Sequence, residues 1–301
     1  MIRKSICALA ACGFVLSACN PAPQPVPTEQ SEAVFASPYF TVATHGNGPD
    51  VILVPGLASH AAIWDETVEA LKDIYTLHVV QVSGFGGADP RGNASNDDIL
   101  DDLANDLSRY TAGLDHGAIV VGHSLGGLVS LKTALNAESQ INQIVIVDVL
   151  PFFSVLMDPA ATSDSIAPVS AIMKATLLSQ SDEIFAQRQA EALTALIKSD
   201  ENRALALSWS VSSDRSVMAQ AMSEVLVTDL RSEIANIKIP ATIIYAKDET
   251  IPNMDSVEVL YQDLYAPLEN GTLVPIENGL HFIMLDQPDA FIEALEAALL
   301  R

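Results

Sequence analysis

The segment Gly122-His123-Ser124-Leu125-Gly126 places one serine between two glycines, Gly122 and Gly126, at the spacing G-x-S-x-G. It follows an apolar run over residues 118–121 and precedes a helical pattern over residues 128–135. Between a strand and a helix this spacing forms a tight elbow, where side chains at the two glycine positions would clash with the neighbouring strand and helix. The pattern predicts Ser124 as a nucleophile whose hydroxyl lies exposed above the carboxyl edge of a sheet.

A serine nucleophile needs a base, and the base needs an orienting acid. The chain has six histidines. His281 lies after the last predicted strand and before the last helix, where the base belongs in the chain order serine, acid, histidine. His123 is adjacent to the serine, and we expect it to pack beside the elbow instead. The N–H of Leu125, at the start of a helix, is directed toward a developing oxyanion.

Two aspartates compete for the role of the acid. Asp248 lies in a loop after the apolar run 242–245, and Asp148 ends the run 144–147. Both are expected near the carboxyl edge of the sheet. A buried aspartate at a strand end often has only a hydrogen-bonding role, so we predict Asp248 as the acid, keep Asp148 as the alternative and place Glu249 third.

The elements that must position these residues are short apolar runs that alternate with helical patterns. The runs are continuous and cover residues 51–54, 77–82, 118–121, 144–147, 242–245 and 272–276. Continuous apolar runs are typical of strands that are covered on both faces, as in a parallel sheet. Leu100, Leu103, Leu107 and Tyr110 have helical spacing. The alternation predicts an α/β fold with a mostly parallel sheet and helices on both faces.

Residues 151 to about 236 break this alternation because their pattern is helical and poor in strands. We interpret them as a helical cap inserted into the domain after Asp148. Flexible methionine side chains in this segment suit an adaptable apolar surface, although any one of them is more often ordinary core. Phe152, Phe153 and Trp209 are candidates for an acyl pocket, with a core position as the alternative.

Together these motifs resemble the α/β-hydrolase superfamily, particularly its esterases, C–C hydrolases and cofactor-free haloperoxidases. Val54-Pro55-Gly56-Leu57, followed by Trp64, is similar to the superfamily's oxyanion loop. Ser83-Gly84-Phe85-Gly86 and the segment from His281 to Gln287-Pro288 are similar to two further motifs. The resemblance covers residues 39–150 and 237–301, and it implies that the N–H groups of Leu57 and Leu125 form the oxyanion hole.

The chain departs from the superfamily pattern at two positions. Pro55 replaces the usual histidine before Gly56, which leaves the Leu57 N–H intact but removes a structural side chain. Leu280 replaces a glycine before His281. Neither change removes a catalytic group, and a serine nucleophile speaks against haloalkane dehalogenation, which needs a carboxylate there.

The first residues have the pattern of an export signal. Arg3 and Lys4 precede an apolar run that is too short to span a membrane, and Leu-Ser-Ala-Cys19 resembles the lipobox of bacterial lipoproteins. That resemblance implies a signal peptide over residues 1–18, a lipid on Cys19 and attachment to a bacterial membrane in the cell envelope, such as the outer membrane facing the periplasm. A proline-rich tether over residues 19–38 would lead into a hydrolase domain over residues 39–301.

Charge and cysteine content exclude other classes of function. The formal charge is −23, which disfavours nucleic acids and anionic lipid headgroups. The three cysteines all lie within the first nineteen residues, so the folded domain has no disulfide and no cysteine metal site.

We expect a serine hydrolase for carboxylic esters, with no cofactor or metal and a small acyl substrate. The alternatives are another bond cleaved by the same triad (C–C, lactone, amide or peracid chemistry) and a non-enzymatic surface lipoprotein.

Overall fold

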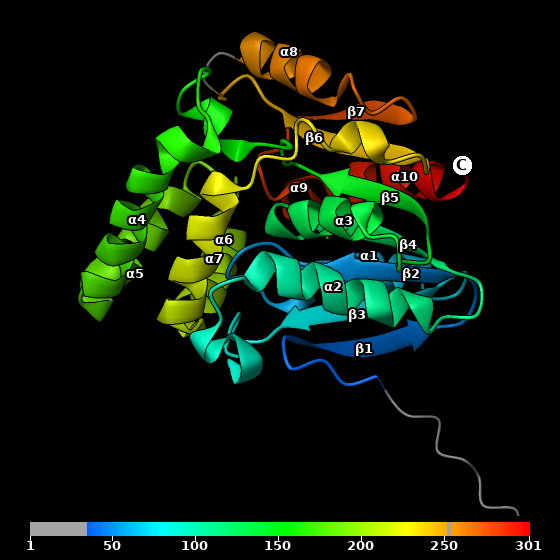
Figure 1. Ribbon diagram of the computed structural model, residues 1–301, viewed down its shortest axis with the longest axis horizontal. Coiled ribbons are helices and arrows are strands. Elements are labelled where there is room, and N and C mark those ends of the chain that lie inside the picture. Colours follow the sequence, from blue (N-terminus) through cyan, green and yellow to red (C-terminus); the bar gives the residue numbers. More distant parts are fainter. Residues whose placement is uncertain (1–34, 252–253) are drawn as a thin grey trace, which may run out of the picture. The chain divides into compact units, whose positions relative to one another are not determined.

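The computed structural model describes residues 35–251 and 254–301, which Figure 1 shows. The predicted signal peptide, Cys19 and most of the predicted tether lie outside these residues. The described chain is anchored to the fold from its first residues, because the Ser37 hydroxyl donates a hydrogen bond to Asp106 (2.7 Å). Within the described ranges, no helix combines the length and the apolar character needed to cross a membrane.

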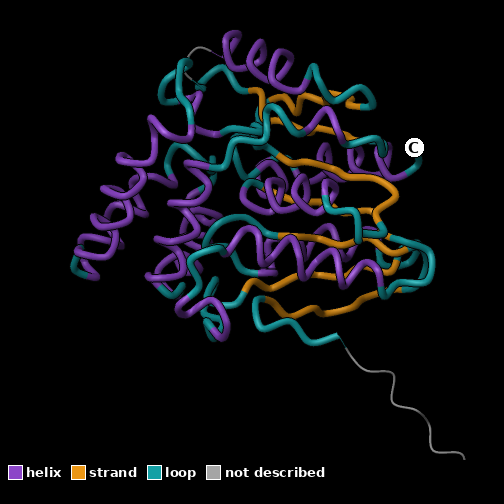
Figure 2. Tube along the Cα trace, in the orientation of Figure 1, coloured by secondary structure: helices purple, strands orange, loops and turns teal. Residues whose placement is uncertain are grey.

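A seven-stranded sheet forms the centre of the domain (Figure 2). Its strands are β1 (Phe40–Gly46), β2 (Asp50–Val54), β3 (Thr76–Val82), β4 (Ala118–His123), β5 (Ile141–Val147), β6 (Ala241–Lys247) and β7 (Gly271–Glu277). Their order is β1-β3-β2-β4-β5-β6-β7. β1 pairs antiparallel with β3, and the other pairings are parallel. The prediction of a mostly parallel sheet is confirmed.

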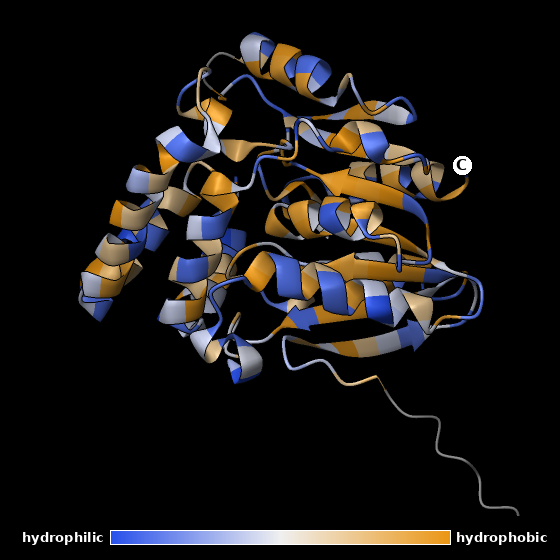
Figure 3. Cartoon of the chain, viewed as in Figure 1, coloured by the Kyte–Doolittle hydropathy of each residue, from blue (hydrophilic) through white to orange (hydrophobic). Residues whose placement is uncertain are grey.

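The central strands are apolar along most of their length because successive side chains enter two different cores. Ile52 and Val54 of β2 belong to the cluster on one face of the sheet, whereas Val51 and Leu53 belong to the cluster on the other. Figure 3 shows the central strands as predominantly hydrophobic. In a strand that is buried on both faces, an apolar side chain at any position stabilises the fold, which explains why the apolar run in the sequence is continuous.

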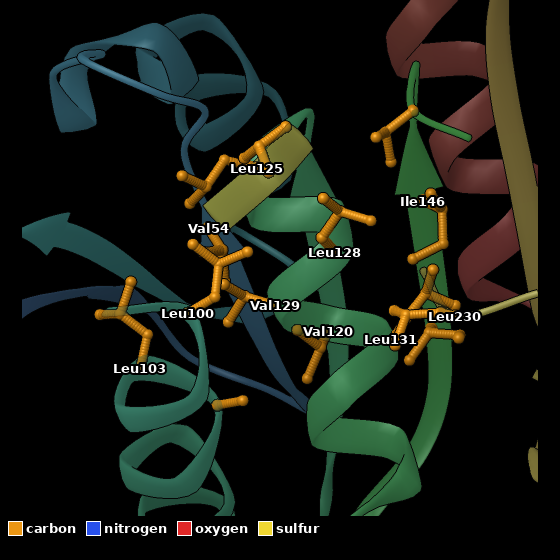
Figure 4. Close-up of a cluster of buried hydrophobic side chains, with 14 of the residues drawn as sticks. Val54, Leu100, Leu103, Val120, Leu125, Leu128, Val129, Leu131, Ile146 and Leu230 are labelled. Carbon is orange, nitrogen blue, oxygen red and sulfur yellow. The ribbon is translucent and has the colours of Figure 1, made fainter. Parts of the chain in front are cut away.

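Helices cover both faces of the sheet. The helices α2 (Ile99–Ala112), α3 (Leu125–Leu135) and α8 (Met254–Tyr265) pack on one face, and α1 (Asp65–Leu71), α9 (Ile283–Asp286) and α10 (Pro288–Leu299) contribute to the other. Figure 4 shows the first of these cores, in which Leu128 and Leu131 of α3 cluster with Val120 of β4 and Ile146 of β5. The buried helix α3 carries the elbow serine at its start, so this core fixes the serine relative to the sheet.

Between β5 and β6 the chain forms four helices that stand at one end of the sheet (Figure 1). They are α4 (Ser163–Ser179), α5 (Asp182–Leu193), α6 (Asp200–Ser212) and α7 (Arg215–Val227). Each begins at a polar residue whose side chain accepts a hydrogen bond from a backbone N–H of the first turn, namely Thr162, Ser181, Ser199 and Asp214. These N-caps explain where the helices start. We call the segment from η3 (Phe153–Leu156) to η4 (Ile234–Asn236) the cap.

Short 3-10 helices occur in four of the connections between these elements. They are η1 (Ala61–Trp64), η2 (Arg91–Ser95), η3 (Phe153–Leu156) and η4 (Ile234–Asn236). The strand β1 was not predicted, because most of its residues are exposed and it lacks a continuous apolar run. As an antiparallel strand at the sheet's edge it needs only one buried face.

Parallel pairing aligns the carboxyl ends of the strands that matter for the site. Val54 pairs with Gly122, and Val147 pairs with both His123 and Ile244. The residues that follow β2, β4, β5 and β6 therefore emerge side by side at one edge, beneath the cap.

Candidate active site

Ser124 lies in the elbow between β4 and α3 with φ 54° and ψ −121°, a backbone conformation that non-glycine residues rarely adopt. The glycines around it make this elbow possible. A Cβ on Gly122 would lie 2.1 Å from the carbonyl oxygen of Gly126, and a Cβ on Gly126 would lie 2.4 Å from the carbonyl oxygen of Val54. Both distances are far inside van der Waals contact, which is the steric reason expected for the G-x-S-x-G spacing.

The loop after β2 passes directly over the elbow. A Cβ on Gly56 would lie 2.9 Å from Nδ1 of His123 and 3.2 Å from Cβ of Ser124. This close approach brings Leu57 to the wall of the cavity above Ser124, which Leu125 also lines. Leu125 is the first residue of α3, so its N–H has no acceptor within the helix. Two backbone segments thus meet where an oxyanion would form.

His281 shares this cavity wall with Ser124. Its Nδ1 lies 2.7 Å from Oδ2 of Asp148, so Nδ1 carries the proton and Nε2 is left as the basic nitrogen. The loop that holds His281 is fixed to the cap, because the N–H of Phe282 donates to the carbonyl of Leu196 (3.1 Å). The base and its acid therefore have a defined geometry in the absence of substrate.

Asp148 follows β5 with φ 51° and accepts hydrogen bonds at both carboxylate oxygens. Oδ2 faces His281, while Oδ1 accepts from the N–H of Ala246 (2.8 Å) and the hydroxyl of Tyr261 (3.2 Å). Burial alone would raise the pKa of Asp148, but the hydrogen bond and charge of His281 and the Ala246 N–H together lower it. Asp148 is therefore held as a carboxylate.

The structure corrects the predicted partner of His281. Asp248 forms an ion pair with Lys198 of the cap and accepts from the N–H of Thr250 (2.8 Å). The Lys198 ammonium and then the Thr250 hydroxyl lower the pKa of Asp248 to about 2. Asp148, the alternative, occupies the position beside His281. β5 and β6 are adjacent and parallel, so both carboxylates emerge at the same edge, and their other partners decide which one meets the histidine.

His123 packs beneath His281 and is fully buried. Its Nε2 lies 3.0 Å from the carbonyl oxygen of His281, which requires an Nε2–H donor. Burial, with the neighbouring His281, lowers the pKa of His123 to about 3, so the ring is neutral and its Nδ1 is unprotonated. His123 supports the backbone of His281 and lies beside the elbow, as expected.

The cavity above Ser124 has a volume of about 540 Å³ and mostly apolar walls. Phe153 and Trp209 of the cap line it, whereas Phe152 is completely buried, with Arg231 lying 4.6 Å above its ring. Over residues 35–251 and 254–301, no group of three or more histidine, cysteine, aspartate or glutamate side chains could hold a metal ion. The polar side chains that line this apolar cavity include Ser124, His281 and Asp148.

Sequence reasoning did not identify two of the residues that shape this site. Tyr261 donates to Asp148 from α8, and Lys198 pairs with Asp248 from the segment between α5 and α6. Tyr261 lies more than a hundred residues from Asp148 in the chain, and nothing in its local pattern distinguishes it from a core residue. Their roles depend on the tertiary structure.

Comparisons with known proteins agree with this fold. A family model described as "Alpha/beta hydrolase family" matches residues 51–294. The chain is 28% identical over 264 residues (85% of its length and 98% of the relative's) to a "Pimeloyl-[acyl-carrier protein] methyl ester esterase" from Nitrosomonas europaea. It is similar in fold to a hydrolase from Pseudomonas aeruginosa PA01, with TM-score 0.70, 21% identity and coverage of 86% of this chain and 94% of that one. An enol-lactonase from Burkholderia xenovorans LB400 gives TM-score 0.69, 18% identity and coverage of 87% and 96%.

Proposed function

The chain belongs to the alpha/beta hydrolase family, and from that premise we propose that it hydrolyses carboxylic esters through an acyl-enzyme formed on Ser124. The observation that supports this most is the 2.7 Å contact between His281 and Asp148, with His281 and Ser124 lining one cavity. This is the arrangement that activates a serine hydroxyl, with a base that is held in one tautomer by a buried carboxylate.

In the proposed reaction the Ser124 Oγ attacks the ester carbonyl while Nε2 of His281 accepts its proton. Asp148 stabilises the imidazolium that forms. The N–H groups of Leu57 and Leu125 bind the negative oxygen of the tetrahedral intermediate. His281 then returns the proton to the leaving alcohol, and a water molecule, activated by the same histidine, hydrolyses the acyl-enzyme.

The relative from Nitrosomonas europaea supports an ester as the substrate, since its name specifies a methyl ester esterase. The same residues can in principle open a lactone or cleave a C–C bond, and a shared fold does not settle which bond is cleaved. The type of bond that the enzyme cleaves has to be determined by experiment.

The test combines labelling and turnover. We expect a fluorophosphonate probe to label Ser124 in the folded protein and Ser124→Ala to lose both labelling and p-nitrophenyl ester hydrolysis, by roughly 10⁴-fold or more in kcat. Enol-lactones and vinylogous diketones are assayed in parallel. Unchanged ester turnover in Ser124→Ala would overturn the proposal, and turnover confined to the lactone or diketone would reassign the bond.

We also propose that the mature protein is attached to a bacterial membrane through a lipid on Cys19. The support is the Leu-Ser-Ala-Cys19 ending after a short charged and apolar leader. Stable anchoring takes more than one acyl chain or a second attachment signal. The formal charge of −23 provides no electrostatic attachment to anionic headgroups, so the lipid would have to hold the protein.

A further inference from the structure

We infer that the cavity selects neutral esters that carry a long apolar chain and rejects esters with an anionic group inside it. This inference rests on the proposed esterase function and concerns the substrate class of the same site. It depends on four features of the cavity: its apolar walls, its size, the charges that line it and its mouth.

The walls above Ser124 are apolar on both the cap side and the sheet side. Trp209 of α6 and Met218 and Met222 of α7 line the cavity from the cap, and Leu150 and Phe282 line it from the loops after β5 and β7. Each methylene that moves from water onto such a wall improves binding by about fourfold. A substrate chain therefore gains affinity with length until the cavity is full.

The size of the cavity limits that chain. Its volume of about 540 Å³ is that of roughly 18 water molecules in the liquid, at about 30 Å³ each. This is room for a medium-length acyl chain with its ester group and an alcohol of the size of p-nitrophenol. A bulky or branched polymer would not fit.

Among the residues that the structure describes, no lysine or arginine lines the cavity, so none of these supplies a permanent cation to an anionic substrate. His123 is neutral because its pKa is lowered to about 3, chiefly by burial. Asp148 contributes a negative charge, and Lys198 is already paired with Asp248. A substrate carboxylate would lose its water, gain no partner and lie in the field of a carboxylate.

The mouth of the cavity is apolar as well. Leu156 of η3 lines the cavity and is also 47% exposed, so it lies where the cavity meets solvent. The adjacent Met157 is 51% exposed. These apolar side chains favour the entry of an apolar substrate chain. The net negative charge of the protein lowers the local concentration of anions.

One polar pair in the cap offers a way to change this selectivity. Gln189 of α5 and Ser210 of α6 both line the cavity, and the Ser210 hydroxyl donates to Oε1 of Gln189 (3.0 Å). Gln189 is only partly buried, so a lysine there could keep its stem against the wall and extend its ammonium into the cavity. Gln189→Met is the matched neutral control.

The experiment measures kcat/KM for the p-nitrophenyl esters of acetate, butyrate, hexanoate and octanoate, and for the mono-ester of octanedioate. The last two have the same chain length but differ in a terminal carboxylate. We expect kcat/KM to rise with chain length and the octanoate ester to be preferred over the octanedioate mono-ester by roughly 100-fold or more. In Gln189→Lys this ratio should fall at least about tenfold relative to Gln189→Met.

The wild-type ratio needs no variant, so a variant that fails to fold leaves the inference testable. Fluorophosphonate labelling of Ser124 counts the folded sites in every sample. If the protein is labelled and hydrolyses acetate but shows no preference for chain length or neutrality, the inference is overturned and the proposed function stands. If it is neither labelled nor active on any ester, the proposed function itself fails.

Discussion

Asp148 is the residue on which the chemistry of the site depends most closely. Its carboxylate accepts from His281 and from the Ala246 N–H, at 2.7 and 2.8 Å, and these two bonds hold it in place beside the cavity. Asp248 emerges from the adjacent strand but is occupied by Lys198 and Thr250. The two carboxylates are therefore expected to respond differently to the same substitution.

We expect Asp148→Asn to lower kcat by about 10³- to 10⁴-fold, because the amide cannot hold His281 in the reactive tautomer or stabilise its imidazolium. The matched variant Asp248→Asn should keep kcat within about tenfold and reduce stability instead, because Lys198 loses its partner. Steady-state kinetics and urea unfolding separate the two effects. The reverse result, with Asp248→Asn inactive and Asp148→Asn active, would restore the acid that the sequence predicted.

Tyr261 is a positioning residue for Asp148 rather than a group that reacts. Burial raises the pKa of Tyr261, so its hydroxyl keeps the proton that it donates to Oδ1 of Asp148 at 3.2 Å. Its ring stacks 4.6 Å from that of Tyr245, whose own hydroxyl donates to Glu258 instead. The rings of the two tyrosines thus stack on each other, but their hydroxyl groups donate to different carboxylates.

Tyr261→Phe should lower kcat by about 3- to 10-fold with little change in KM, because the ring that lines the cavity remains while one hydrogen bond to the carboxylate is lost. Tyr245→Phe is the control and should leave kcat unchanged. A purely structural role for Tyr261 predicts equal losses of stability in both variants and no change in kcat for correctly folded protein. Kinetics normalised to labelled Ser124 distinguish these outcomes.

At the scale of elements, a partly buried carboxylate of the cap contacts the sheet domain. Glu224 of α7 accepts hydrogen bonds from the N–H groups of Ile99 (2.9 Å) and Leu100 (2.7 Å) at the start of α2. These N–H groups have no acceptor within their own helix, and the positive end of the helix favours a negative charge. Glu224 therefore joins the cap to the helix that covers β2 and β3.

This carboxylate gives the stability a defined pH dependence. Burial raises the pKa of Glu224 above its ordinary 4.5, and the bonds from Leu100, Gln220 and Ile99 only partly offset this. A raised folded-state pKa means that the proton binds more tightly in the folded state, so this contribution is present below pH 4.5 and lost as pH rises through the raised pKa. Glu224→Gln has no titratable carboxyl group at this position, so it lacks this contribution to the pH dependence of stability.

We expect wild-type stability relative to Glu224→Gln to decrease as pH rises from 4.5 toward neutrality. Glu224→Ala should lose about 1–3 kcal/mol at every pH, because two backbone N–H groups lose their acceptor. Urea unfolding at several pH values measures both effects. A difference between wild type and Glu224→Gln that stays constant with pH would contradict this account of Glu224.

The elements and the site differ in how much could be predicted from the sequence. Strands such as 51–54 and 144–147 were predicted because burial on both faces leaves a continuous apolar run, and the elbow because steric contact restricts Gly122 and Gly126. The strand β1 lacks that run because it lies at the sheet's edge. The choice between Asp148 and Asp248 depends on Lys198 and Tyr261, whose contacts exist only after folding.

At the scale of the whole molecule, charge and predicted attachment act in opposite directions. The chain has 38 acidic and 15 basic residues, so the protein is repelled by anionic headgroups while its proposed substrates are apolar. Attachment through a lipid would keep the enzyme near a membrane without electrostatic contact. Two other cysteines, Cys7 and Cys12, precede Cys19 within the predicted signal peptide and offer a matched comparison.

We expect Cys19→Ser to move the protein out of the membrane fraction or leave it unprocessed, while Cys12→Ser behaves as wild type, because only Cys19 ends the lipobox. High salt should not release the wild type, since acyl chains rather than charges would hold it. Detergent should release it with ester turnover intact, because Ser124, Asp148 and His281 all lie within the folded domain.

Fractionation followed by intact mass measurement checks the lipid directly. A Cys19→Ser protein that stays in the membrane fraction, or a wild type that salt removes, would show that something other than this cysteine holds the enzyme.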